Sequence, residues 1–77
     1  MLEQVREIMT RYVELEPEEI RMDSKLAEEL GLTSFAVMSM MGDFEEEFGI
    51  TVDESELTDI HTVGDIIAYL EEKQAEG

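Results

Sequence analysis

Residues 33–49 have the sequence TSFAVMSMMGDFEEEFG, in which large apolar side chains recur at intervals of three and four residues. This spacing predicts an amphipathic helix that begins at Thr33 or Ser34 and ends near Gly49. The predicted core face consists of Val37, Met40, Met41, Phe44 and Phe48. The predicted solvent face consists of Ser39, Gly42, Asp43 and Glu46, with Phe35, Ala36 and Glu47 beside it and Met38 at its margin.

The sequence on both sides of this helix predicts three more. Residues 2–15 carry one stripe of apolar side chains and are expected to form a helix that stops before Pro17. A brief helix is expected to start at Asp53 or Ser55, with Leu57 and Ile60 pointing inward. The spacing of residues 62–65, TVGD, is that of a capping box and marks the start of the last helix, whose predicted core face consists of Val63, Ile66, Ile67 and Leu70.

A long connection joins the first two helices. Within it, Asp23 or Ser24 could cap a short turn that ends at Gly31. The pattern as a whole predicts an all-α fold, a small four-helix bundle with three main helices, a short third helix and a long first loop. We expect residues 1–77 to form a single domain.

The composition limits what this chain can do. Its 21 acidic residues outnumber its five Lys and Arg, the net charge is −16, and residues 26–72 contain neither Lys nor Arg. Such a surface repels nucleic acid and attracts basic protein surfaces, although acidity can also serve solubility alone. The chain has no cysteine and therefore no disulfide, and with one histidine it lacks the ligands of an ordinary zinc site. Without a long apolar run or a secretory signal, we expect a cytoplasmic monomer with no membrane span.

No group of residues indicates catalysis or metal binding, and we expect a protein that is not an enzyme. His61 stands alone and is expected to be a solvated or capping residue at a helix junction, and Glu45 to Glu47 are better explained as a solvated helix face than as an acid–base pair. The remaining candidate is Ser34, whose hydroxyl would lie at a helix N-terminus, where backbone N–H groups and the helix dipole favour an anion. On position alone, a purely structural N-cap role explains Ser34 better.

Three segments carry a family resemblance. Residues 30–35 (LGLTSF), 44–50 (FEEEFGI) and 62–70 (TVGDIIAYL) together resemble acyl carrier proteins over nearly the whole chain. The resemblance implies that a phosphopantetheinyl transferase (holo-carrier synthase) attaches 4′-phosphopantetheine from coenzyme A covalently to Ser34. It also implies that the thiol of this arm carries acyl groups as thioesters to enzymes of fatty acid or related lipid or polyketide biosynthesis. Phe48 lies fourteen residues after Ser34, which is the spacing of the family.

A second serine could be mistaken for the attachment site. The segment from Asp23 to Leu26 is closer to the family's Asp-Ser-Leu triplet than the segment from Thr33 to Phe35 is. Ser24, however, lies ten residues too early for the spacing, and no long amphipathic helix follows it directly. We therefore expect Ser34 to be the modified residue.

The resemblance also implies a partner-binding surface on the helix that follows Ser34. Enzymes of this family commonly meet it with basic patches, and the contacts expected here are Phe35, Ala36, Met38, Ser39, Asp43, Glu46 and Glu47. Five positions depart from the family: Thr33 replaces an aspartate, Phe35 a leucine, Ala36 and Ser39 commonly acidic residues, and Gly42 a frequently larger apolar residue. The first turn is therefore less acidic than is usual. Two alternatives stay open: an aminoacyl or peptidyl carrier, and an unmodified acidic module that binds a basic protein.

Overall fold

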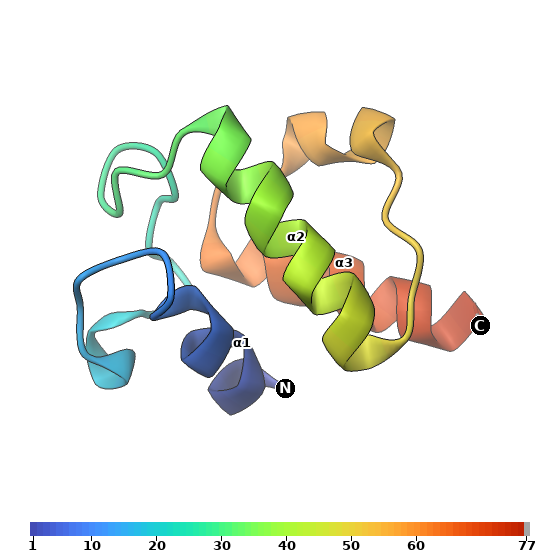
Figure 1. Ribbon diagram of the computed structural model, residues 1–77, viewed down its shortest axis with the longest axis horizontal. Coiled ribbons are helices and arrows are strands. Elements are labelled where there is room, and N and C mark those ends of the chain that lie inside the picture. Colours follow the sequence, from blue (N-terminus) through green and yellow to red (C-terminus); the bar gives the residue numbers. More distant parts are fainter. Residues whose placement is uncertain (77) are drawn as a thin grey trace.

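The computed structural model describes residues 1–76, and Gly77, the last residue of the expected domain, lies outside the described residues. The elements are α1 (Leu2–Met9), η1 (Pro17–Glu19), α2 (Ser34–Phe48), η2 (Glu54–Asp59) and α3 (Val63–Glu76). Helices α1, α2 and α3 and the short helix η2 confirm the predicted four-helix fold, and the described residues form no strand. In Figure 1, α2 crosses in front of α3, and the long first connection lies on the same side as α1. No helix within residues 1–76 is long and apolar enough to cross a membrane.

Helix α2 has the predicted bounds. Gly49 ends it with a φ of 64°, a left-handed conformation that glycine adopts without strain. Met40, Met41 and Phe44 are buried in the core, and the remaining members of the predicted core face, Val37 and Phe48, are partly buried. Gly42 lies on the predicted solvent face, since a Cβ atom there would meet nothing within 4 Å, although the residue itself is not fully exposed. Gly42 is half-buried in a small hollow that Val52 and Leu57 also line, because the chain after α2 folds back over this flank.

Helix α1 is shorter than predicted. It ends at Met9, whereas the apolar stripe predicted a helix to residue 15. The N–H groups of Arg11 and Tyr12 bond to carbonyl groups three residues earlier, which tightens the last turn, and bends follow. This change of direction buries Val13 and brings the Tyr12 hydroxyl to 2.5 Å from a carboxylate oxygen of Asp43 on α2. Tertiary contacts therefore override the helical pattern of residues 10–15.

The capping expected from Asp23 or Ser24 is also wrong. Ser24 is buried, and its hydroxyl accepts the N–H of Arg21, so it closes the turn before it instead of starting the turn after it. The N–H of Lys25 is bound by the Glu29 carboxylate at 2.8 Å. The turn ends at Gly31 as predicted, with a φ of 68°. Backbone hydrogen bonds to residues 61–64 hold this segment against the start of α3.

The predicted capping box of α3 is confirmed. Thr62 Oγ1 accepts the N–H of Asp65 at 3.1 Å, and the Asp65 carboxylate accepts the N–H groups of His61 and Thr62 at 2.9 and 3.1 Å. The His61 N–H makes the largest contribution to a lowered pKa of Asp65, since these donors favour its ionised form. The buried face of α3 is the predicted one, formed by Val63, Ile66, Ile67 and Leu70.

Replacement of Asp65 tests this cap. Asp65→Ala removes the acceptor for two N–H groups and should lower the free energy of unfolding by about 1 kcal/mol near neutral pH. Because the pKa of Asp65 is lower in the folded protein, its contribution is present above the ordinary carboxyl pKa and is lost as the pH falls through the folded-state value. Urea unfolding over a pH series measures both effects. Asp59→Ala, which removes the same charge from an exposed position, is the control; equal losses in the two variants would contradict the capping role.

Candidate functional site: the serine at the start of α2

Ser34 is the first residue of α2, and its hydroxyl is free. The N-cap is Thr33, whose Oγ1 accepts the N–H of Ala36 at 3.1 Å. The N-cap interpretation of Ser34 is therefore wrong, because the preceding residue fills this role. Ser34 is exposed, and no hydrogen bond within residues 1–76 engages its hydroxyl. This oxygen is available for covalent modification.

The helix end around Ser34 suits a phosphate. Helix α2 contains 15 residues and has no acidic side chain in its first turn. No carboxylate of that turn therefore neutralises the unsatisfied N–H groups and the positive end of the helix dipole. A phosphodiester on Ser34 would be stabilised at this position.

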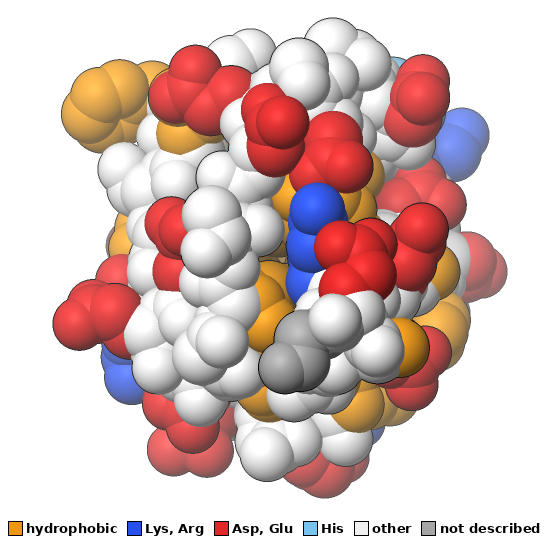
Figure 2. Space-filling model, turned by 90° about the vertical axis from the view of Figure 1, so that its right-hand side faces the viewer, with side chains coloured by type: hydrophobic (Ala, Val, Ile, Leu, Met, Phe, Trp, Pro, Cys, Tyr) orange, Lys and Arg blue, Asp and Glu red, His pale blue; other side chains and the backbone are white. Residues whose placement is uncertain are grey.

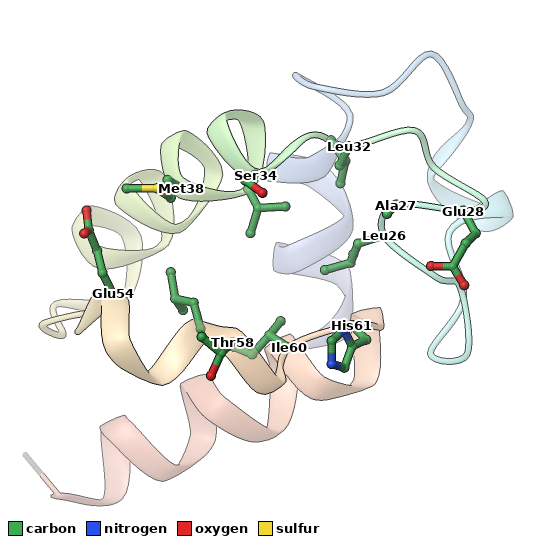
Figure 3. A pocket seen from close by; sticks show the side chains of 12 residues that line it. Leu26, Ala27, Glu28, Leu32, Ser34, Met38, Glu54, Thr58, Ile60 and His61 are labelled. Carbon is green, nitrogen blue, oxygen red and sulfur yellow. The ribbon is translucent and has the colours of Figure 1, made fainter.

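A cavity of about 370 Å³ opens beside Ser34. Figure 3 shows Ser34 at its rim, with side chains of α2, of η2 and of the first connection around the same space. Its apolar lining consists of Leu26, Ala27, Leu32, Val37, Met38, Leu57 and Ile60. Its polar lining consists of Glu28, Glu54, Thr58 and His61. A mostly apolar cavity of this kind accepts an aliphatic group.

Helix η2 forms one wall of this cavity. It is a 3₁₀-helix of six residues, and the Asp53 carboxylate caps it by accepting the N–H of Ser55 at 3.0 Å. Leu57 and Ile60 are partly buried and point inward as predicted. Sequence reasoning did not identify the cavity, because its walls come from segments far apart in the chain. It treated His61 as a residue of a helix junction, whereas its ring also lines the cavity.

The expected partner-binding residues occupy different environments. Phe35 is 81% exposed, Met38, Ser39, Glu46 and Glu47 are exposed, and Ala36 is half-buried. The Asp43 carboxylate accepts the Tyr12 hydroxyl and lies 3.7 Å from Arg11 Nη1, and its hydrogen bond is the main cause of a raised pKa of Tyr12. The Asp43 carboxylate is thus already bound to Tyr12 and Arg11 of the same chain. Glu46 and Glu47 are the expected acids that form no salt bridge within residues 1–76.

The other serine and the acidic residues offer no competing site. Ser24 is 4% exposed and its hydroxyl already accepts a hydrogen bond, so a transferase could not reach it without local unfolding. Within residues 1–76, no group of three or more His, Asp or Glu side chains could hold a metal ion. The free hydroxyl of Ser34 and the cavity beside it therefore fit an attached arm that carries an aliphatic group.

Comparison with known proteins agrees with this geometry. The sequence model of a family described as "Phosphopantetheine attachment site" matches residues 3–70. The chain is 36% identical to an acyl carrier protein of Thermotoga maritima, over 90% of this chain and 85% of that one. It is 32% identical to an acyl carrier protein of Wolinella succinogenes, over 92% and 93% of the two chains.

A solved structure has the same fold. The acyl carrier protein from Enterococcus faecalis superposes with a TM-score of 0.78 at 24% identity, covering 94% of this chain and 91% of the other. With the family match over residues 3–70, these similarities extend through all four helices. The chain belongs to the family of acyl carrier proteins, which are carriers rather than catalysts and bear a covalently attached 4′-phosphopantetheine.

Proposed function

We propose that Ser34 is the attachment site and that the arm on it carries acyl intermediates as thioesters. The observation that supports this most directly is the free hydroxyl of Ser34 at the N-terminus of α2 and at the rim of an apolar cavity. When bound, the arm supplies a terminal thiol that holds the acyl group. The chain supplies the attachment oxygen, a positive helix end beside the phosphate, and apolar walls that exclude water from the cargo.

The pathway and the partners are part of the same proposal. The named relatives support delivery of acyl groups to enzymes of fatty acid or related lipid or polyketide biosynthesis. The net charge of −16 would attract partners with basic patches. Such partners would include a phosphopantetheinyl transferase that binds the start of α2. The mostly apolar cavity lining favours acyl groups over the aminoacyl or peptidyl groups of the alternative carrier class. Residues 1–77 would act as one carrier domain, a monomer in the cytoplasm.

Labelling with a phosphopantetheinyl transferase tests the attachment site. With coenzyme A and magnesium, the wild-type chain should gain one phosphopantetheine, located on the Ser34 peptide by mass spectrometry. Ser34→Ala should abolish the gain, because the accepting oxygen is lost. Ser24→Ala is the control and should still be labelled once if the variant is folded, as judged by its circular dichroism. Labelling of the Ser34→Ala variant would refute the assignment, and an unlabelled wild type would favour the unmodified interaction module.

Docking at the first turn of α2 gives a second test. This turn presents Phe35, Met38 and Ser39 but no acid, so a generic enzyme of fatty acid synthesis with a basic patch should bind it poorly. The double variant Ala36→Asp with Ser39→Glu should raise kcat/KM of a bacterial malonyl transferase roughly two- to tenfold, since each exposed charge pair adds little. Phe35→Ala should lower kcat/KM of the natural partner roughly tenfold, because an exposed aromatic side chain is a typical anchor.

A matched control separates local contact from net charge. Gln74→Glu with Ala75→Asp adds the same two charges to exposed positions in the last turn of α3, 40 residues or more after Ser34 in the chain. This variant should leave kcat/KM with the malonyl transferase nearly unchanged. An equal gain from both double variants would show that long-range attraction, and not the first turn of α2, determines partner choice.

A further inference from the structure

Helix η2 forms a wall of the cavity, but little apolar burial holds it in place. Glu54, Leu57 and Thr58 line the cavity, as does Ile60 directly after the helix. None of residues 54–59 is buried. Elements with few buried apolar contacts open locally at low free-energy cost. Besides the partial packing of Leu57 and Ile60 against the core, the polar contacts of η2 therefore matter for keeping it closed over the cavity.

A cluster of polar contacts joins η2 to α3, and we call its four residues, Asp53, Glu56, Tyr69 and Lys73, the η2 clasp. Lys73 Nζ lies 2.9 Å from Glu56 Oε1, and the Tyr69 hydroxyl donates to the same oxygen at 2.8 Å. The N–H of Asp53 donates to the Tyr69 oxygen at 3.1 Å. Tyr69 and Lys73 are four residues apart on α3 and therefore share one face, with the ammonium group 5.6 Å from the ring centroid.

The clasp is less solvated than the ion pairs of Arg21 and Lys25, although Arg6, in its pair with Glu3, is similarly covered at 18% exposure. The side chain of Lys73 is 17% exposed, whereas the side chains of Arg21 and Lys25 in their pairs are 66% and 59% exposed. Figure 2 shows the corresponding face, where a basic side chain lies in a hollow between acidic ones. Lys73 lines a groove on this face together with Phe48, Ile50 and Asp53. An ion pair in such a groove, with a hydroxyl bound to the same carboxylate, is stronger than a freely solvated pair.

The titration of the clasp residues agrees with this arrangement. The Lys73 ammonium, and after it the Tyr69 hydroxyl, lower the pKa of Glu56, and Glu56 in turn raises the pKa of Lys73. Each partner thus favours the charged form of the other. Within residues 1–76, these contacts are the side-chain hydrogen bonds and ion pairs that link η2 and its cap Asp53 to α3.

We propose that Tyr69 and Lys73 are positioning residues that hold η2 closed and thereby control access to the cargo cavity beside Ser34. The inference rests on the proposed function, because it assigns the cavity to the acyl group on the arm. When the clasp is intact, η2 stays against α3, and the thioester cargo is shielded from water and from small nucleophiles. When the clasp opens, Leu57 and Ile60 move with η2, and the wall of the cavity is lost. An enzyme that docks near η2 could open the cavity by competing for Glu56 with a basic side chain of its own.

The test uses the protein with an octanoyl thioester on its arm, after mass spectrometry has confirmed one modification on Ser34. Lys73→Met removes the cation but keeps much of the side-chain stem, and Tyr69→Phe removes only the hydroxyl. Arg21→Met is the matched control, because it removes the same charge from an exposed pair outside the clasp. Lys73→Arg keeps the charge and should restore the contact to Glu56.

Two readouts are compared among these variants. Amide hydrogen exchange of residues 54–60 should become roughly five- to tenfold faster in Lys73→Met and Tyr69→Phe, the factor expected for the loss of ordinary, partly solvated hydrogen bonds, while residues 40–44 of α2 exchange as in the wild type. Cleavage of the thioester by hydroxylamine should accelerate by a similar factor. Arg21→Met should match the wild type in both readouts, and Lys73→Arg should come close to it.

The outcomes distinguish this inference from the proposed function. Unchanged exchange at residues 54–60 in both clasp variants would overturn the inference, and so would faster exchange with unchanged thioester cleavage, because the clasp would then not control access to the cargo. Failure of Ser34 to accept the arm would instead overturn the proposed function. Exchange measured on the unmodified chain would in that case still decide whether the clasp holds η2.

Discussion

The hydrogen bond from the Ala36 N–H to the Thr33 hydroxyl fixes where α2 begins, and the site depends on that starting point. Because Thr33 is the cap, Ser34 occupies the first helical position with its hydroxyl uncommitted. The same starting point sets the rotation of the helix. Met40, Met41 and Phe44 then face the core, and Phe35 faces solvent beside Ser34. A shift of one residue would turn each side chain by about 100° and would separate the attachment oxygen from the cavity.

Some charged side chains of the described residues form salt bridges with one another, whereas others remain unpaired and can attract a partner. Each of the five Lys and Arg side chains forms a salt bridge with an acidic residue of the chain, and two of these bridges join distant segments: Arg11 with Asp43, and Lys73 with Glu56. Most of the 21 acids therefore have no basic partner within residues 1–76. Glu46 and Glu47, exposed on α2, contribute to a field that attracts basic surfaces, while the first turn beside Ser34 offers apolar contact. The later turns of α2 thus provide the long-range attraction, and its first turn provides the apolar contact surface.

Helix η2 combines two properties that a carrier of a reactive thioester requires. Its side chains complete the apolar cavity, yet its own residues are not buried, so its position depends on polar contacts that a partner can replace. Polar contacts at a partly solvated surface are individually weak and break readily. The fully buried core residues lie outside η2, and only Leu57 and Ile60 at η2 pack against them. The cavity can therefore open without loss of the fold.

The sequence by itself determined the four-helix fold, the bounds of α2, the capping box of α3 and the buried face of each of these helices. These features are set by interactions within about four residues. They can therefore be predicted from the apolar periodicity and from the capping residues Thr33, Gly49 and Asp65. Only the tertiary structure decided that α1 ends at Met9, that Asp43 is engaged by Tyr12, that Ser24 is buried, and that η2 and the first connection enclose a cavity beside Ser34. Each of these depends on contacts between residues far apart in the chain, whose energies outweigh local preference and leave no periodic signal in the sequence.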